Sequence, residues 1–189
     1  FGAITRNWNR NRMARQKSGK SISCDSIVIT GGGKTYPSLG SDGSCYGLAK
    51  AFGHKIVEPV PSAVPLLAKD RFCHLLQGQK IQCIAKSIID GKIQKEIEGE
   101  LLFTKYGLSG TAILDVSRPI SIALNRSARK SVEVIIDMAP FISAEELRNE
   151  LIKRTKEKRS QDDMLVGILP NKFGPALKRM IDIKNADKA

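Results

Sequence analysis

Residues Ile81 to Thr104 read IQCIAKSIIDGKIQKEIEGELLFT, and this stretch decides the fold of the middle of the chain. Two runs rich in isoleucine, 81–89 and 92–97, flank the dipeptide Asp90-Gly91. Asp and Gly adopt the left-handed backbone of a two-residue hairpin turn at low energetic cost. The pattern therefore predicts an antiparallel β-hairpin whose turn is Asp90-Gly91.

The segments that follow this hairpin extend the sheet. Residues 99–104 (GELLFT) and 132–137 (VEVIID) each read as a β-strand. Between them, Ser109 can open a short helix that runs to about Ser117 and stops before Pro119. The sequence therefore predicts a small antiparallel sheet or barrel with one short helix inserted in it.

The last part of the chain is predicted to be helical. Ser143 and Glu146 fit a capping box, in which each side chain accepts a hydrogen bond from the backbone N–H of the other residue. A helix is expected from Ala144 to about Arg159. Residues 164–169 and 175–183 read as two shorter helices, so a small helical unit should follow the sheet.

Upstream of the hairpin, a strand and a glycine-rich loop are expected. Residues 22–30 (ISCDSIVIT) end in an apolar β-branched run, which is typical of a buried strand in a parallel sheet. The loop 31–43 follows, and then a short helix at 44–52 that ends at Gly53. Three prolines, at positions 59, 61 and 65, predict an extended connector, and we place a domain boundary near 56–61.

The loop contains TGGGKT at Thr30 to Thr35, which invites comparison with a nucleoside-triphosphate phosphate loop. The spacing excludes that class, because the first glycine of the motif would fall at Val28, inside the predicted strand. Pro37 also obstructs the helix that should follow the lysine. On its residues alone, the loop is equally consistent with a ligand-binding backbone and with a tight surface turn.

The formal net charge is +12, so nucleic acid has to be considered as a partner. Aromatic residues make up only 5% of the chain, and no zinc-finger or RNA-stacking signature is present, so a nucleic-acid partner is disfavoured. A solvated basic surface is the preferred interpretation of the cation runs. They comprise Arg6, Arg10, Arg12, Arg15, Lys17 and Lys20 near the start and Lys153, Arg154, Lys156, Lys158 and Arg159 on the predicted helix.

The remaining composition favours a cytoplasmic protein without a metal. The four cysteines, Cys24, Cys45, Cys73 and Cys83, form no C-x-x-C pair, so we expect reduced thiols and no metal site. No apolar run approaches the ~20 residues of a membrane span. The N-terminus also lacks the apolar core of a signal peptide.

The order of motifs along the chain resembles a known family. The resemblance spans residues 22–175 and is carried by 24–32, by KTYPSLGS at 34–41, by PVPSAVPLL at 59–67, by GELLFT and by Leu169-Pro170. Also collinear are Leu76-Gln77-Gly78, Gly107-Leu108-Ser109-Gly110, Ser117-Arg118 and Ile136-Asp137. In this order they are similar to the bacterial NAD(P)/FAD-dependent oxidoreductases called aminoacetone oxidase-like or BaiN-like.

The resemblance implies an interior fragment of a flavoprotein: an FAD-dependent oxidoreductase of the NAD(P)H dehydrogenase or reductase type, inactive as an isolated chain. The implied electron donor is NAD(P)H and the substrate a small molecule, bound between the insertion and the flavin domain. The fingerprint for the ADP half of FAD would precede this chain, which should not retain FAD alone. The implied FAD-contacting residues are Thr30, Gly31, Gly32, Lys34, Tyr36, Pro37, Gly40, Ser41, Gly43 and Tyr46.

The expected fold class is α+β, in three parts. Residues 1–57 would be the remnant of an FAD-binding α/β domain, 58–138 a small antiparallel β-rich, barrel-like insertion, and 139–189 a small helical unit. The motifs assign neither a catalytic acid or base nor an oligomeric state.

Two other functional classes stay open at this point. One is a basic, non-enzymatic module that binds nucleic acid or an acidic partner, suggested by the net charge. The other is a degenerate family member with only a structural role. It is suggested by Ser44-Cys45, which lacks the acidic residue and the glycine that the family commonly has there, before a tyrosine that this chain retains as Tyr46.

Overall fold

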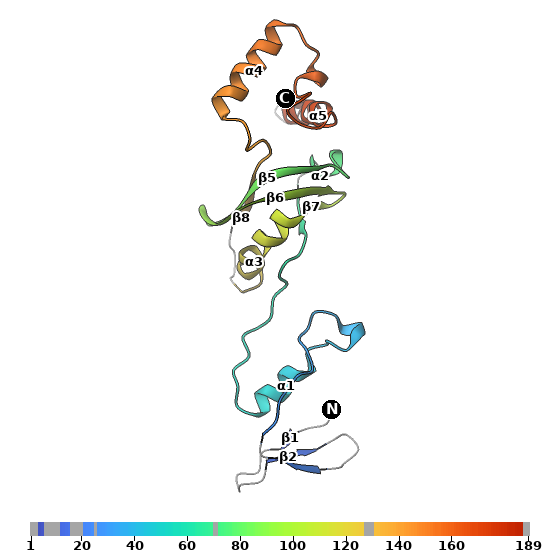
Figure 1. Ribbon diagram of the computed structural model, residues 1–189, viewed down its shortest axis with the longest axis vertical. Coiled ribbons are helices and arrows are strands. Elements are labelled where there is room, and N and C mark those ends of the chain that lie inside the picture. The colour runs from blue at the N-terminus through green and yellow to red at the C-terminus, as the bar shows by residue number, and fades with distance from the viewer. Residues whose placement is uncertain are drawn as a thin grey trace. The chain divides into compact units, whose positions relative to one another are not determined.

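The computed structural model describes residues 4–5, 12–15, 21–24, 26–69, 72–126 and 131–186, with side chains described at 26–69, 72–126 and 131–181. The chain forms two compact units, Phe1–Pro59 (unit 1) and Val60–Ala189 (unit 2) (Figure 1). The predicted division of unit 2 at residue 138 stays a prediction.

Unit 1 combines a small sheet, the glycine-rich loop and one helix. Strands β1, β2 and β3 pair antiparallel in that order. The bounds are β1 Ile4–Thr5, β2 Arg12–Arg15, β3 Ser21–Cys24, the 3-10 helix η1 Pro37–Leu39 and α1 Ser44–Ala51. The predicted helix at 44–52 is confirmed. Gly53 follows it with a left-handed φ of 86° and donates its N–H to Lys50.

The predicted buried parallel strand at 22–30 is wrong. β3 ends at Cys24 and is antiparallel to β2, whereas residues 26–30 form neither strand nor helix, and Val28 is 82% exposed. An apolar run becomes a parallel strand only where neighbouring strands take up its backbone hydrogen bonds and other elements cover both faces. Within the described part of unit 1, no strand lies beside 26–30.

Unit 2 contains a curled, five-stranded antiparallel sheet in the order β4-β7-β6-β5-β8 (Figure 1). The strands are β4 Leu66–Leu67, β5 Lys80–Ile89, β6 Lys92–Thr104, β7 Gly107–Ser109 and β8 Val132–Asp137. The predicted hairpin is confirmed, because Ile89 pairs with Lys92 and both Asp90 and Gly91 have positive φ, at 50° and 74°. Residues 99–104 are not a separate strand but continue β6.

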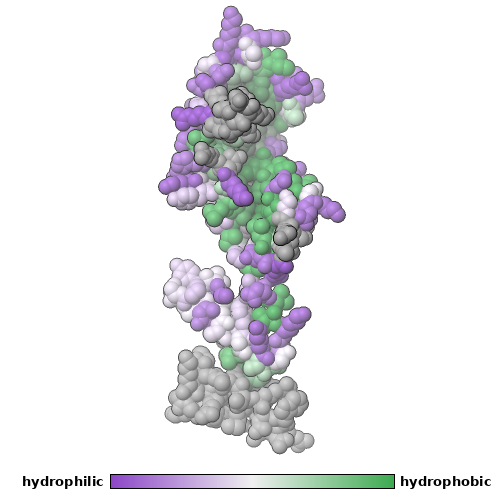
Figure 2. All heavy atoms as spheres, turned by 180° about the vertical axis from the view of Figure 1, so that it is seen from behind, coloured by the Kyte–Doolittle hydropathy of each residue, from purple (hydrophilic) through white to green (hydrophobic). Residues whose placement is uncertain are grey.

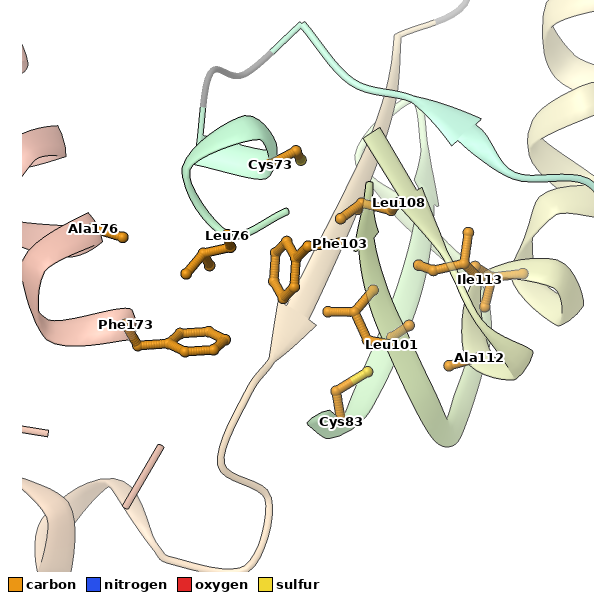
Figure 3. Close-up of a cluster of buried hydrophobic side chains, with 12 residues drawn as sticks. Cys73, Leu76, Cys83, Leu101, Phe103, Leu108, Ala112, Ile113, Phe173 and Ala176 are labelled. Atoms are coloured by element: carbon orange, nitrogen blue, oxygen red, sulfur yellow. The ribbon is translucent and has the colours of Figure 1, made fainter. Parts of the chain in front are cut away.

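The core of unit 2 lies on the sheet face that α3, Thr111–Arg126, covers. Alternate residues of β5, among them Cys83 and Ala85, are buried against this helix. In Figure 3 the ring of Phe103 lies between the side chains of Leu101 and Phe173. The Phe103 and Phe173 rings meet edge to face at 5.7 Å between centroids. Burial, and then the negative charge of Asp137, raise the pKa of the Cys83 thiol to about 11.

Helix α3 is twice the expected length, because it continues through Pro119 to Arg126. A proline inside a helix removes the hydrogen bond to the carbonyl four residues earlier, here that of Asp115. Lys95 Nζ donates to that carbonyl oxygen at 2.9 Å, so it is not left without a partner. The predicted stop before Pro119 is therefore wrong, since a side chain from β6 replaces the missing donor.

The helical part contains α2 Phe72–Leu75, α4 Ala144–Lys156, η2 Gln161–Asp163 and α5 Phe173–Ala186. The capping box of α4 is confirmed. Ser143 Oγ accepts from Glu146 N at 3.2 Å, and Glu146 Oε2 accepts from Ser143 N at 3.0 Å. The predicted helix at 164–169 is wrong, because Gly167 has a φ of 81° and the segment forms turns. The helix predicted at 175–183 lies within α5. These observations confirm the α+β class with a curled antiparallel sheet and helices.

Candidate functional site

The glycine-rich loop is closed by backbone hydrogen bonds around η1. Tyr36 O accepts from Leu39 N at 3.0 Å and from Ser41 N at 3.2 Å, and Gly40 N donates to Pro37 O at 3.0 Å. Gly40 has a φ of 89°, a conformation that glycine adopts without strain. The segment Tyr36 to Ser41 is therefore a tight, self-bonded turn with Pro37 at the first helical position.

The three contiguous glycines pack against residues from the far side of the loop and from α1. A Cβ added at Gly31 would overlap Cys45 Sγ, one at Gly32 would lie 3.0 Å from Ser41 Oγ, and one at Gly33 would lie 3.1 Å from the Tyr46 hydroxyl. The structure therefore brings the end of segment 26–30 together with Ser41, Cys45 and Tyr46. Sequence reasoning did not identify Cys45 as a contact, since nothing in its spacing indicates that Gly31 packs on it.

The start of α1 is already occupied by a carboxylate. Asp42 Oδ1 accepts from Ser44 N at 2.9 Å, and Gly43 precedes the helix with a φ of 86°. The N-terminal amides of a helix favour negative charge, and an aspartate of the chain itself supplies it here. A phosphate group would compete with Asp42 for this end of the helix.

The opposite side of the loop is open. Thr30, Gly31, Gly32, Lys34, Pro37 and Gly40 are exposed, whereas Ser41, Gly43 and Tyr46 are half-buried. Three apolar side chains are also exposed: Val28 at 82%, Tyr36 at 59% and Leu39 at 81%. The residues predicted to contact FAD thus fall into an outward-facing set and a set that holds the loop together.

This arrangement fits a flat cofactor better than a bound phosphate. Gly31 and Gly32 are exposed and have no side chain, so a planar ring can approach their backbone closely. The half-buried residues behind them keep the loop in shape. The first amide of α1 is already bonded to Asp42. The exposed side of Thr30 to Gly43 therefore has room for a flat ring, and Lys34 is an exposed cation of the same loop.

Unit 2 contains a hollow beside the hairpin turn. It has a volume of about 480 Å³, within the size range of small-molecule sites. Four apolar and three polar side chains line it: Ile89, Pro119, Ile122 and Ala123, and Asp90, Lys92 and Gln94. The continuation of α3 through Pro119 creates one wall of this hollow.

The basic cluster on α4 separates into two kinds of cation. Arg154 is 8% exposed; its Nε donates to Glu150 Oε1 at 2.7 Å, and its Nη1 donates to the carbonyl oxygens of Met164 at 3.0 Å and Val166 at 2.7 Å. Arg159 pairs with Glu157 at 3.0 Å. Arg148, Lys153, Lys156 and Lys158 are exposed, and no carboxylate in the described part of the chain forms an ion pair with them.

The described residues contain neither a metal-binding cluster nor a membrane-spanning helix. No three side chains of His, Cys, Asp or Glu in the described ranges lie close enough together to hold a metal ion. No helix among those residues is both long and apolar enough to cross a membrane.

Comparison with known proteins places unit 2 in a family. Residues 60–189 match the family described as HI0933-like protein barrel and H2TH domain. This range coincides with unit 2, which holds the curled sheet and the helices α2 to α5.

Three curated relatives are similar to this chain, and two of the matches are longer than unit 2. A 3-dehydro-bile acid delta(4,6)-reductase of Clostridium scindens is 30% identical over 169 residues, which is 88% of this chain and 41% of that protein. A ribosomal RNA dihydrouridine synthase of Haemophilus influenzae is 29% identical over 86% of this chain and 38% of its own length. One of Escherichia coli is 30% identical over 53% of this chain and 25% of its own length.

The chain thus spans about two fifths or less of the curated relatives it matches. The match to unit 2 and the similarity that continues into unit 1 agree with the motif order read from the sequence. The chain belongs to the HI0933-like family, a family of flavoprotein oxidoreductases.

Proposed function

We propose that this chain is the barrel-and-helix region, with one flavin-contacting loop, of an FAD-dependent reductase that takes electrons from NAD(P)H. The observation that carries the proposal is the open loop at 26–43, whose exposed glycine backbone lies on a chain of this flavoprotein family. FAD, when bound, would supply the hydride-transfer chemistry. The chain's own part is to present Thr30, Gly31 and Gly32 to the ring and Lys34 beside it.

The proposed reaction is the reduction of a ring carbon–carbon double bond next to a carbonyl group. The names of the relatives indicate reactions of this kind. One acts on a 3-dehydro bile acid with double bonds at positions 4 and 6, and the others convert uridine to dihydrouridine. In the proposed reaction a hydride and a proton add across the double bond, and NAD(P)H is oxidised to NAD(P)+.

A small-molecule substrate is the first candidate. The hollow beside Asp90 supports it, because its volume suits a small ring system and its walls are mainly apolar, with Lys92 and Gln94 as polar groups that can orient a carbonyl. The steroid substrate in the name of the Clostridium scindens relative has this character.

RNA is the second candidate. It is supported by a net charge of +12, by the exposed cations on and just after α4 and by the two relatives named ribosomal RNA dihydrouridine synthases. An RNA substrate would need a surface that contacts phosphates outside the reacting ring, and the exposed end of α4 is such a surface.

The isolated chain should bind FAD weakly and reduce nothing, because one loop supplies only part of a cofactor site. The test compares this chain with the same chain extended by its flanking coding sequence. We expect yellow, FAD-containing protein and NAD(P)H oxidation only for the extended form. An extended protein without FAD, or without any NAD(P)H-dependent reductase activity, would contradict the proposal.

The loop and the substrate can then be tested in the extended protein. Lys34→Ala should weaken FAD binding several-fold, whereas Lys55→Ala, which removes an exposed lysine outside the loop, should not. For the substrate, a cyclic enone steroid and an RNA transcript are each incubated with NADPH or NADH. Gain of two hydrogen atoms in the mass spectrum of the steroid, or of uridine in the digested RNA, identifies the class.

A further inference from the structure

Helix α4 and the turn after it carry four exposed cations that form no ion pair with a carboxylate of the described residues. The basic ridge consists of Arg148, Lys153, Lys156 and Lys158, and all four side chains are exposed. In Figure 2 hydrophilic side chains project from the end of unit 2 that carries α4. Ile152 lies in the same face of the helix and is 45% exposed.

The buried side chain of Arg154 holds the helix that carries the ridge in place. Arg154 points the opposite way from Lys156 and bonds to Glu150 and to two backbone carbonyl groups of the segment 164–166. Helix α4 is therefore clamped to the turn that precedes α5. This clamp holds the orientation of α4 relative to that turn. On the exposed side of the helix, no carboxylate of the described residues forms an ion pair with the ridge cations.

Helix stabilisation alone does not account for the ridge. Cations in the last turn of a helix interact favourably with its macrodipole, which is a sufficient reason for Lys153 and Lys156. Arg148 lies too far from the C-terminus for this effect, and Lys158 lies beyond the helix with a φ of 54°.

One face of the sheet in unit 2 is acidic. On the sheet face opposite α3, Glu98 and Asp137 flank Ile84 on the two neighbouring strands, and both are exposed. Glu96 and Glu100 lie on the same face, each paired with one lysine. A polyanion would be repelled by this sheet face and attracted by the ridge.

We propose that the basic ridge of α4 binds the phosphate backbone of RNA. Arg148 and Lys156 are separated by about 12 Å along the helix axis, the rise of about three to four stacked nucleotides, so one strand can contact all four cations. Ile152 then lies where a sugar or base edge can cover it. This inference rests on the RNA candidate of the proposed function, and it assigns the contact to a surface separate from the flavin loop.

The test measures binding of the full 189-residue chain to a fluorescein-labelled short single-stranded RNA by anisotropy over a range of salt concentrations. The ridge variant replaces Arg148, Lys153, Lys156 and Lys158 by glutamine. The matched control replaces four other exposed lysines by glutamine, at Lys50, Lys55, Lys69 and Lys105. Each variant removes four positive charges from the same net charge of +12.

We expect the ridge variant to bind RNA about tenfold more weakly at moderate salt and to lose about 3 from the slope of log K against log salt. The control should change both quantities much less. Replacing Lys153, Lys156 and Lys158 by arginine should retain binding. Circular dichroism checks that each variant is folded, since all of these side chains are exposed.

Three outcomes would overturn the inference. The first is equal weakening by the ridge and control variants, which would mean unspecific attraction by net charge. The second is no RNA binding by the unaltered chain at low salt. The third is ridge-dependent binding to vesicles that contain phosphatidylserine, with none to RNA. None of these depends on FAD, so reductase activity of the extended protein is tested independently.

Discussion

The core of unit 2 and the glycine-rich loop of unit 1 are built in opposite ways. In unit 2, Leu76, Leu101 and Phe173 are completely buried and belong to one contiguous cluster. In unit 1, none of the side chains described, residues 26–59, is buried, and Val28 and Leu39 are more than four-fifths exposed. Backbone hydrogen bonds and close glycine contacts hold the loop instead.

This difference shows that unit 2 is stabilised by its own core. Apolar burial is the main favourable contribution to folding, and unit 2 contains a contiguous cluster of buried apolar side chains. The apolar side chains of the loop gain nothing while they face water, so they are available to cover a ligand or another protein surface. Substitutions in the two units should therefore differ sharply in their effect on stability.

The largest expected effect is in the core of unit 2. Phe173→Ala removes a buried ring that packs edge to face on Phe103, and it should lower the free energy of unfolding by about 3–5 kcal/mol. Val28→Ala, in the exposed run of unit 1, should change it by less than about 0.5 kcal/mol. Urea denaturation followed by far-UV circular dichroism measures both. Similar losses in the two variants would contradict the comparison.

A smaller effect is expected at the clamp between α4 and the following turn. Arg154→Met keeps the apolar stem but removes the donors to the carbonyl groups of Met164 and Val166, so the free energy of unfolding should fall by about 2–4 kcal/mol. Lys153→Met changes an exposed neighbour on the same helix and should have little effect. Faster hydrogen exchange at 164–169 in the first variant alone would locate the loss. Equal exchange in both variants would show that Arg154 is not a clamp.

The same contrast explains how much of the structure was predictable from the sequence. Predictions succeeded where residues close in the sequence determine the local structure. Asp90-Gly91 specifies its turn through its own backbone preferences, and Ser143 caps its helix through contacts three residues away. Predictions failed where a distant group decides the outcome. Lys95 allows α3 to pass through Pro119, and no sequence window of helix length contains both residues.

The candidate site shows the same limit. The loop was recognised by the order of its motifs, and the structure places Gly31 against Cys45 and Gly32 against Ser41. The strand predicted at 22–30 is wrong, because a parallel strand depends on neighbours that its own residues do not specify. In the structure, Asp42 accepts a hydrogen bond from the first amide of α1.

A modest effect is expected at the cap of α4, and it should depend on pH. Ser143→Ala removes a capping hydroxyl and should cost about 1 kcal/mol, whereas Ser62→Ala in the exposed connector should cost almost nothing. Hydrogen bonds from the Ser143 side chain and then its backbone N–H lower the pKa of Glu146. A carboxylate with a lowered pKa stabilises the folded state above its ordinary pKa and loses that contribution as the pH falls through the folded value.

The difference in stability between unaltered protein and Ser143→Ala should therefore be full at neutral pH and shrink in acid. Urea titrations at a series of pH values, from neutral to below the ordinary pKa of a glutamate, measure it. A difference that stays constant over this range would mean that the hydrogen bonds to Glu146 do not contribute through its ionised form.

The smallest effect on global stability is expected in the loop, where it should be local and reversible by a second change. Gly31→Ala places a methyl group on Cys45 Sγ, so the loop must shift. The free energy of unfolding of unit 2 should not change, because its core lies outside this loop. Hydrogen exchange of the α1 amides should become faster.

Cys45→Ala removes the sulfur, and the next contact at 3.7 Å, to Cys45 Cβ, is ordinary van der Waals distance. The double variant Gly31→Ala, Cys45→Ala should therefore regain the slow exchange, whereas a control pair of Gly31→Ala with Ser38→Ala should not. If Cys45→Ala fails to restore exchange, the glycine is required for a reason other than its contact with Cys45. Approach of a cofactor to the exposed side of the loop would then become the explanation to test, by the same variants with FAD in the extended protein.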